Sequence, residues 1–257
     1  MMPVIRGQYP YPYMATPRFF SSTPLAAHTT IELPDALAHH AIRVLRLKPD
    51  SDIVLFDGKG GQYSAKLIID GKRGHAALGE HDPVETELDG RITLVQGIPS
   101  GDKMDWIIEK AVELGAVRVV PIAARRSVLQ LTGDRLRKRL EHWRRIAQAA
   151  SEQSGRNRIM DIAEPCSLDH YLARDMTDAA ATLFCHPDSP CSLAQALQAQ
   201  QTELALLVGP EGGWSDEEQD LVARCKLTGV SFGKRVLRTE TAGLALIAAV
   251  SALQGWS

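Results

Sequence analysis

Charged and hydroxyl side chains gather in one short segment just before an apolar run near the end of the chain. Residues 233–243 read Gly-Lys-Arg-Val-Leu-Arg-Thr-Glu-Thr-Ala-Gly. A guanidinium such as that of Arg238 binds phosphates or polarises a carbonyl, and a carboxylate such as that of Glu240 accepts protons. A salt bridge between these two residues, with Thr239 or Thr241 as a helix N-cap, would explain the same pattern. The segment predicts either a polar ligand site or a salt-bridged loop.

A second loop suited to a ligand lies upstream. Residues 204–208 predict a buried strand that runs directly into Gly209-Pro-Glu-Gly-Gly213. This turn lacks the spacing of a P-loop or a Rossmann fingerprint. Ser215 and Glu218 have capping-box spacing, so carboxylates occupy the helix N-terminus that a phosphate would use. The turn is either a simple connection or the binding site of a cationic or neutral ligand, for which S-adenosylmethionine is a candidate.

A parallel sheet would position both loops. From residue 91, apolar runs that predict strands alternate with helical patterns, which is typical of an α/β fold. Asp102 and Gly115 bound the first helical pattern as N-cap and stop signal. The expected strands are residues 92–98, 117–122, 181–185, 204–208 and 230–232, with helices at 102–114 and 134–153. Ligands of such sheets lie outside the carboxyl ends of the strands. The loops at Cys185, Gly209 and Gly233 should therefore line one pocket.

The preceding part of the chain has a different texture. Short β-like runs such as residues 53–56 and 63–69 alternate with glycine-rich turns, and residues 39–45 suggest a short helix. We expect three parts: a flexible tail at residues 1–16, a small β-rich domain at 17–90 and an α/β domain at 91–257.

A basic segment stands out against a nearly neutral chain. The whole chain of 257 residues has a net charge of −2, but residues 125–158 contain ten Lys or Arg against three acids. Such a segment is either a solvated helix face or a surface that contacts nucleic-acid phosphates. Arg18-Phe-Phe20 combines a cation with two aromatic rings, which either stack on bases or belong to a small core.

Several classes of function lack support. The four cysteines have no metal-ligand spacing, and neither H-E-x-x-H nor G-x-S-x-G occurs, so we expect no metal site and no serine hydrolase. The longest apolar run, residues 242–253, is shorter than the roughly 20 residues of a membrane span. We expect a cytoplasmic protein without a secretory signal.

Five motifs together resemble those of the RsmE family of ribosomal RNA methyltransferases, in order from about residue 17 to 254. They are Arg18-Phe-Phe20, Glu109-Lys-Ala-Val-Glu-Leu-Gly115, Glu152-Gln-Ser-Gly-Arg156, Gly209-Pro-Glu-Gly-Gly213 and Arg235-Val-Leu-Arg-Thr-Glu-Thr-Ala242. The chain departs from the family pattern at Trp214, Phe232 and Val236, where Phe, Leu and Ile are expected. These are changes of bulk in the pocket wall.

The resemblance implies a PUA-like β-barrel followed by a SPOUT domain with a trefoil knot. It also implies a homodimer that uses S-adenosylmethionine to methylate N3 of a uridine in the decoding region of 16S ribosomal RNA, within the small ribosomal subunit. The implied cofactor contacts are Cys185, His186, Val208, Gly209, Pro210, Glu211, Gly212, Gly213, Phe232, Gly233, Val236, Leu237, Arg238 and Ala242. The candidate RNA contacts are Arg18, Arg43, Arg46, Arg125, Arg126, Arg156, Arg158, Lys234 and Arg235.

Methylation at N3 requires loss of the N3 proton, which assigns hypothetical catalytic roles. Arg238 would stabilise the developing imide anion near O2 or O4 of the base. Glu240 would either orient Arg238 or accept the proton. Two competing interpretations are a non-catalytic factor that binds RNA or assists ribosome assembly, and an α/β enzyme with a nucleotide cofactor. Cofactor binding would discriminate among them.

Overall fold

The computed structural model describes residues 16–71, 73–127, 132–176, 181–197 and 201–256. The predicted tail, residues 1–16, falls almost entirely outside these ranges. The chain divides into two compact units between Val84 and Glu85; we call them the N-terminal unit and the C-terminal unit. Within the described ranges, no helix has the length and apolar character needed to span a bilayer.

The N-terminal unit is built on a five-stranded sheet. Side chains of β4 (Gln62–Asp70) alternate between the core and solvent, since Ala65 and Leu67 are buried whereas Lys66 is exposed. The predicted helix near residue 40 begins earlier, as α1 (Asp35–His39), and continues as a π-helix (His40–Val44). The remaining strands are β1 (Arg18–Phe20), β2 (Thr30–Glu32), β3 (Asp52–Phe56) and β5 (Arg73–Asp82), in the order β1-β3-β4-β5-β2.

The C-terminal unit contains a six-stranded sheet whose pairings are all parallel. The strand order is β11-β9-β10-β6-β7-β8. The strands are β6 (Arg91–Gly97), β7 (Arg118–Ile122), β8 (Asp161–Ile162), β9 (Ala181–Cys185), β10 (Glu203–Val208) and β11 (Thr228–Val230). The expected α/β class with a parallel sheet, preceded by a small β-rich module, is confirmed. The last strand differs, because it ends at Val230 and leaves Phe232 in the following loop.

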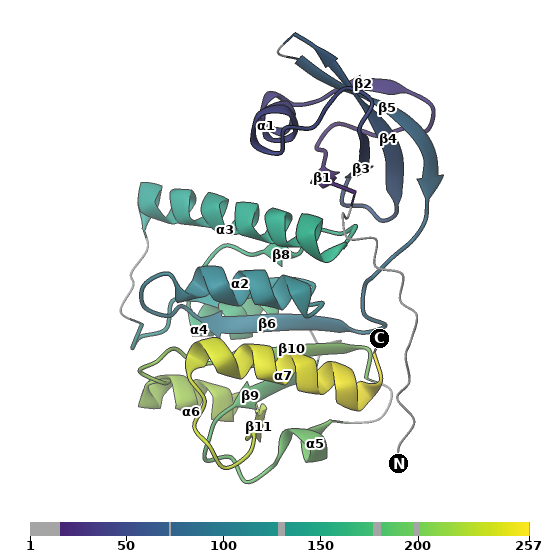
Figure 1. Cartoon of the computed structure of the whole chain (residues 1–257). Helices are drawn as coiled ribbons and strands as arrows, with labels where there is room; N and C mark the ends of the chain where they lie inside the picture. The colour runs from purple at the N-terminus through teal and green to yellow at the C-terminus, as the bar shows by residue number, and fades with distance from the viewer. Residues whose placement is uncertain (1–15, 72, 128–131, 177–180, 198–200, 257) are drawn as a thin grey trace, which may run out of the picture. The chain divides into compact units, whose positions relative to one another are not determined.

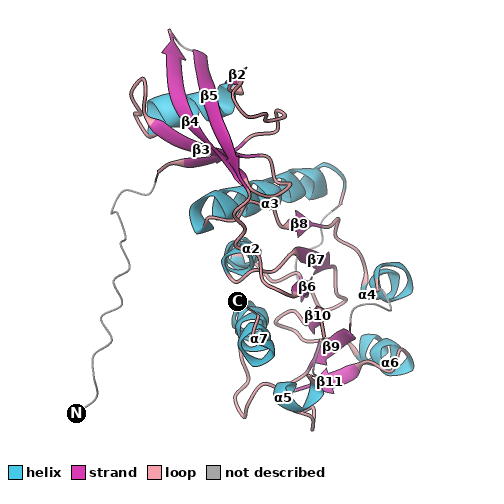
Figure 2. Cartoon of the chain, turned by 90° about the vertical axis from the view of Figure 1, so that its right-hand side faces the viewer, coloured by secondary structure: helices cyan, strands magenta, loops and turns pink. Residues whose placement is uncertain are grey.

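Helices cover both faces of this sheet (Figure 2). On one face lie α2 (Lys103–Glu113), α3 (Gly133–Ser154) and α7 (Thr239–Gln254), and on the other lie α4 (Leu168–His170) and α6 (Asp216–Arg224). A π-helix (Tyr171–Asp175) follows α4, and α5 (Leu193–Ala196) lies near β11. Each face therefore has its own apolar core.

The boundaries of α2 follow the sequence signals. Met104, Ile107 and Ile108 of α2 are buried at the predicted spacing, and Gly115 has the positive φ of 85° that favours glycine after a helix. Asp102 occupies the N-cap position of α2, but its side chain makes no capping hydrogen bond. Its carboxylate instead accepts a hydrogen bond from Arg139 of α3 at 3.3 Å. The predicted N-cap position of Asp102 is confirmed, but its side chain hydrogen-bonds to α3 and does not cap α2.

The last helix returns to the middle of the sheet (Figure 1). Strand β11 is an edge strand, yet α7, which follows it in the chain, packs against the central strands β10 and β6. The connecting segment, residues 231–238, must therefore pass from the edge of the sheet to its centre. It passes near the carboxyl ends of β9 and β10, where its side chains line the pocket described next.

Candidate functional site

A pocket of about 570 Å³ lies at the carboxyl ends of β9, β10 and β11, a size within the usual range of ligand sites. The three loops predicted to meet, at Cys185, Gly209 and Gly233, all contribute to its wall. Its lining consists of Lys103, Arg126, Cys185, His186, Pro187, Val208, Gly209, Pro210, Glu211, Gly213, Trp214, Gln219, Val230, Phe232, Gly233, Arg235, Val236, Leu237, Arg238, Thr239, Glu240, Ala242 and Leu246.

All but one of the candidate cofactor contacts lie in this lining. The exception is Gly212, whose missing Cβ would lie 3.1 Å from the Cβ and carbonyl oxygen of Arg126. Gly212 thus faces the chain after β7, and not the pocket. Trp214 is buried in the wall, whereas Phe232 and Val236 are 40% and 81% exposed. Of the three departures from the family pattern, only Trp214 is a fixed part of the wall.

Carboxylates occupy the helix N-terminus beside the glycine turn. The Ser215 side chain accepts from the backbone N–H of Glu218 at 3.3 Å, and Glu218 accepts from the backbone N–H of Ser215 at 2.8 Å. The other carboxylate oxygen of Glu218 accepts from the backbone N–H of Arg125 at 2.9 Å. The predicted capping box is confirmed. A phosphate at this end of α6 would meet carboxylates in place of free N–H groups.

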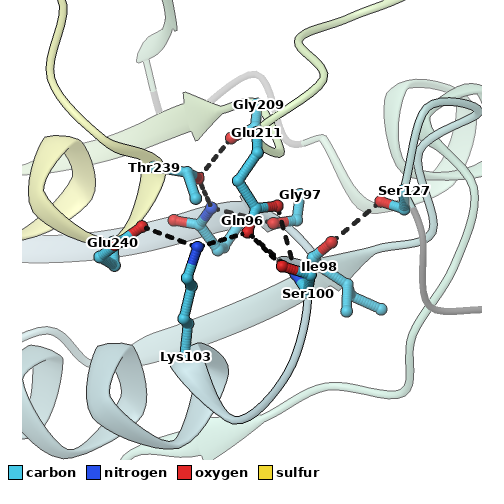
Figure 3. A network of polar contacts seen from close by, with 10 residues as sticks. All are labelled: Gln96, Gly97, Ile98, Ser100, Lys103, Ser127, Gly209, Glu211, Thr239 and Glu240. Atoms are coloured by element: carbon cyan, nitrogen blue, oxygen red, sulfur yellow. Dashed lines mark hydrogen bonds and ion pairs between the residues drawn. The ribbon is translucent and has the colours of Figure 1, made fainter.

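Glu211, in the same turn, is held by a dense set of donors (Figure 3). Its carboxylate accepts from the backbone N–H of Ser100 at 3.1 Å, from the Ser100 hydroxyl at 2.8 Å and from Lys103 Nζ at 2.8 Å. Partial burial alone would raise the pKa of Glu211, but the hydrogen bonds from Lys103 and Ser100 outweigh it and lower the pKa to about 2. Glu211 is therefore a fixed negative charge, unsuited to accept a proton at neutral pH.

Glu240 pairs with Lys103 and not with Arg238. Its Oε2 lies 3.8 Å from Lys103 Nζ, and this oxygen is buried without a hydrogen-bond partner in the described part of the chain. Arg238 is exposed and occupies the N-cap position of α7, while Thr239 is the first helical residue. The alternative of a loop closed by an Arg238–Glu240 salt bridge is not what the structure contains, and neither Thr239 nor Thr241 is the N-cap.

Cys185 and His186 follow β9 at the pocket wall. Burial raises the pKa of the Cys185 thiol to about 12, so it stays protonated at neutral pH. The His186 ring stacks on Phe184 with 5.8 Å between centroids, and the backbone N–H of His186 donates to Val230 at 2.9 Å. These contacts attach the first loop of the pocket to the strand β11 beside it.

Sequence reasoning missed three polar residues at the site: Lys103, Gln96 and Ser100. Two of them, Lys103 and Gln96, have a signal in the sequence. Lys103 places a cation in the first turn of a helix, where the helix dipole disfavours positive charge. Gln96 is a lone amide near the end of an otherwise apolar strand, and it is fully buried. Their partners are distant in sequence, so these signals alone do not identify what each residue binds.

The candidate RNA contacts of the C-terminal unit are exposed, with one exception. Arg125, Arg126, Arg158, Lys234 and Arg235 are exposed on the C-terminal unit. Arg156 is only 3% exposed. It donates to Glu87 and to the backbone carbonyls of Val112 and Ala116. The prediction that Arg156 faces RNA is wrong, because its guanidinium closes a buried ion pair inside the unit.

In the N-terminal unit, Arg43 lies in the last turn of the π-helix and Arg46 follows that helix; both are exposed. Arg18 is half-buried, donates to the Gln62 side chain, and its guanidinium lies 5.3 Å from the centre of the Phe56 ring. Phe19 is buried in the core, as the alternative interpretation of the Phe pair expects.

Comparison with known proteins supplies the family. The model of the RNA methyltransferase domain matches residues 86–251, and the model of the RNA methyltransferase PUA domain matches residues 33–78. Ribosomal RNA small subunit methyltransferase E of Synechocystis sp. is 33% identical over 227 residues, which is 87% of this chain and 73% of the relative. The chain belongs to the ribosomal RNA small subunit methyltransferase E family. The resemblance inferred from the five motifs is confirmed.

Two further members show how far the likeness extends. The Bacillus subtilis methyltransferase E is 30% identical over 230 residues, covering 86% of this chain and 90% of its own length. The Neisseria gonorrhoeae methyltransferase E, in a crystal structure bound to S-adenosyl methionine, superposes with a TM-score of 0.86 at 36% identity. That alignment covers 93% of this chain and 98% of the Neisseria chain. The family fold thus includes both units.

Proposed function

We propose that this methyltransferase transfers a methyl group from S-adenosylmethionine to N3 of a uridine in 16S ribosomal RNA of the small subunit. The observation that carries the proposal is the charge arrangement of the pocket. Glu211 and Glu240 place carboxylates in its wall, and α6 presents acidic residues beside it. The pocket is also lined by the cations Lys103, Arg126, Arg235 and Arg238, so the proposal places the cofactor on its glycine-turn side. There, beside Glu211 and the acidic N-terminus of α6, a ligand with a sulfonium and an ammonium fits, whereas a polyphosphate meets repulsion.

The cofactor, when bound, supplies an electrophilic methyl group. In this proposal the glycine turn at residues 209–213 holds it by backbone groups, since a turn with little side-chain bulk permits close approach. The loop at residues 232–238 closes the opposite side of the pocket, and Ala242 and Leu246 of α7 lie behind that loop. Glu211, kept ionised by Lys103 and Ser100, provides a fixed negative charge toward the cationic ligand.

Arg238 and Glu240 divide the work on the uracil base. The exposed guanidinium of Arg238 stabilises negative charge that develops on the base oxygens as the N3 proton leaves. Glu240 accepts that proton. This role is favoured over the alternative, in which Glu240 orients Arg238, because the carboxylate of Glu240 pairs with Lys103. Lys103 orients the carboxylate that receives the proton.

The ribosomal RNA is bound in this proposal by exposed cations of both units. In the C-terminal unit these include Arg125, Arg126, Arg158, Lys234 and Arg235, together with the arginines of α3. The β-rich domain proposed for residues 17–90 contributes Arg43 and Arg46, together with the half-buried Arg18. Phosphate contacts position the RNA without selecting a base, so affinity should fall steeply with salt.

A homodimer in the cytoplasm completes the proposal. The large apolar side chains of Trp106 on α2 and Leu253 on α7 are 53% and 56% exposed. The two helices contact each other, so these side chains belong to neighbouring elements of the C-terminal unit. A second copy of the chain is the occupant that the family resemblance implies for such exposed side chains. Sedimentation of wild type and Trp106→Ala tests this assignment.

One experiment tests reaction and substrate together. Methyl-labelled S-adenosylmethionine is incubated with the protein and small ribosomal subunits that lack the modification, and the labelled nucleoside is identified by mass spectrometry. The expected result is N3-methyluridine at one site, with no label in subunits that already carry it. Cofactor binding without transfer would move the activity to another RNA. Absence of cofactor binding would favour the non-catalytic RNA-binding factor.

A further inference from the structure

Gln96 is a fully buried amide in the strand β6, between the apolar residue Val95 and Gly97. A buried amide without hydrogen bonds is costly, so its partners indicate what it is retained for. Its Nε2 lies 3.0 Å from the backbone carbonyl oxygen of Gly97 and 2.8 Å from Thr239 Oγ1 (Figure 3). Because the carbonyl can only accept, the atom facing it must be the NH₂ group.

The direction of the next hydrogen bond follows from this assignment. Gln96 uses its two N–H groups as donors to Gly97 and Thr239, so the Thr239 oxygen acts as acceptor toward Gln96. The hydroxyl proton of Thr239 is then free to donate to the backbone carbonyl oxygen of Gly209, which lies 2.5 Å away. A relay of donors therefore runs from Gln96 through Thr239 to Gly209. Gly209 and Thr239 line the pocket, and Gln96 is fully buried next to Thr239.

The relay joins the two loops that the proposed reaction uses. Gly209 begins the glycine turn, while Thr239 stands between Arg238 and Glu240 in the chain. The relay thus connects the glycine turn, which is assigned to the cofactor, with the segment that carries Arg238 and Glu240, which are assigned to the uracil base. Residues 96 and 239 are 143 positions apart, and only the fold brings them together.

The surrounding backbone leaves little freedom for this arrangement. A Cβ on Gly97 would lie 2.5 Å from Cδ and N of Pro210, so the glycine turn rests directly on the end of β6. A Cβ on Gly243 would lie 3.2 Å from Gln96 Oε1. Close packing on both sides fixes the amide, which makes Gln96 a support of defined geometry for both loops.

We propose that Gln96 is a positioning residue of the methyltransferase. Acting through Thr239, it holds the glycine turn in a fixed position relative to Arg238 and Glu240. The inference rests on the proposed function for the identity of the ligand. It assigns Gln96 no contact with cofactor or RNA. Without the relay, the glycine turn is less well held, which lowers cofactor affinity. The start of α7, with Arg238 and Glu240, is also less well held, which lowers the rate of methyl transfer at saturating cofactor.

The test is a double-mutant cycle on Gln96→Met and Thr239→Val, which remove the amide and the hydroxyl with little change of volume. The affinity for S-adenosylmethionine is measured by calorimetry, and methyl transfer is measured in a single turnover at saturating cofactor. Each single variant is expected to lose about tenfold in affinity, because a buried carbonyl or hydroxyl loses its partner. The double variant should also lose about tenfold, because the two groups act as one unit. Thr239→Ser, which keeps the hydroxyl, should restore affinity to within about twofold.

A matched control separates positioning from a general loss of stability. Ser127 is buried and donates to the backbone carbonyl of Ile98 at 3.0 Å, so Ser127→Ala also removes a buried hydrogen bond near the end of β6. It lies outside the relay and should leave affinity and rate within about twofold of wild type. Equal losses in Ser127→Ala and Gln96→Met would overturn the inference.

A pH profile gives a readout that a purely structural role would not change. In Gln96→Glu the new carboxyl group donates one hydrogen bond when protonated and none when ionised. Its cofactor affinity should fall with rising pH, while that of wild type changes little. A flat profile for Gln96→Glu, or roughly hundredfold loss in the double variant, would contradict the relay. A wild-type protein that binds no S-adenosylmethionine would instead overturn the proposed function.

Discussion

Arg156 donates two hydrogen bonds to the carboxylate of Glu87, from Nε at 2.9 Å and from Nη2 at 2.5 Å. Its Nη1 also donates to the carbonyl oxygens of Val112 at 2.9 Å and Ala116 at 2.8 Å. One buried guanidinium thus connects the beginning of the C-terminal unit with the end of α2 and the loop that follows it. Replacing it by alanine leaves a partly buried carboxylate and two carbonyls without these donors.

Arg156→Ala should lower the free energy of unfolding by about 3–5 kcal/mol, the usual cost of breaking a buried ion pair on one side. Urea denaturation followed by circular dichroism measures it. The control is Arg158→Ala, which removes an exposed ion pair with Glu85 at 3.4 Å and should cost about 1 kcal/mol or less. Similar losses of unfolding free energy in the two variants would show that the buried contacts of Arg156 contribute no more to stability than an exposed ion pair.

Arg238→Ala should slow single-turnover methyl transfer by about 10²–10³-fold while cofactor affinity stays within about threefold. The reason is that the guanidinium acts on charge that develops only as the N3 proton leaves. Rapid quench with labelled cofactor measures the rate, and calorimetry measures affinity. Arg235→Ala removes the same charge from the same loop and should leave the rate at saturating ribosomal subunits nearly unchanged. Comparable transfer rates for Arg238→Ala and wild type would remove Arg238 from the mechanism.

Glu211 should make the free energy of unfolding depend on pH over a defined acidic interval. Its pKa is about 2 in the folded protein against an ordinary value of 4.5, so the ionised carboxylate stabilises the fold above about pH 4.5. This contribution is lost as the pH falls through the interval from 4.5 to 2. The difference in unfolding free energy between wild type and Glu211→Gln should therefore shrink across that interval. Because the Glu211 side chain is about one third exposed, we expect a difference on the order of 1 kcal/mol at neutral pH.

Two lysine variants test whether Lys103 causes this pH dependence of stability. Lys103→Met removes a donor to Glu211 and should shift the loss of stability to higher pH. Lys110→Met also removes a lysine from α2, but its partners are Glu109 and Glu113. It should leave the Glu211 interval where it is. An identical interval in wild type and Lys103→Met would contradict the assigned cause.

Cys185 should resist alkylation in the folded protein. Burial raises its pKa to about 12, and the thiolate is the reactive form. Cys225 is exposed and serves as the internal control. After brief treatment with iodoacetamide at neutral pH, peptide mass spectrometry should find Cys225 modified and Cys185 unmodified. Equal modification of both would show that the pocket wall opens readily.

Local patterns explain why much of the fold was predictable. The alternation in β4 and the helical spacing of Ile107 and Ile108 are set by residues next to one another in sequence. The capping box of Ser215 and Glu218 is likewise local, and it was predicted correctly. The meeting of three loops followed from a general rule for parallel sheets.

The missed features all depend on distant partners. Lys103 and Glu211 are 108 positions apart, and no local pattern relates them. Arg156 follows a turn in a polar segment, where an arginine is expected to be exposed. Its guanidinium is nevertheless buried, because it forms an ion pair with Glu87, 69 positions away. One of the two interpretations of residues 233–243 pairs Glu240 with Arg238, which is close in sequence, but at the start of α7 the Glu240 carboxylate lies 3.8 Å from Lys103 Nζ. Side-chain pairing between elements is decided by tertiary packing.

The return of α7 to the centre of the sheet also governs when the pocket exists during synthesis. The ribosome makes the chain from its N-terminus, so Arg238, Thr239 and Ala242 emerge only after all six strands of the parallel sheet. Contacts that span such long separations form slowly, because loop closure must precede them. A nascent chain can complete its β-rich unit and most of its sheet and still have no site for a ligand. The pocket is complete only after α7, which contributes Ala242 and Leu246 to its lining, has emerged and packed against the sheet.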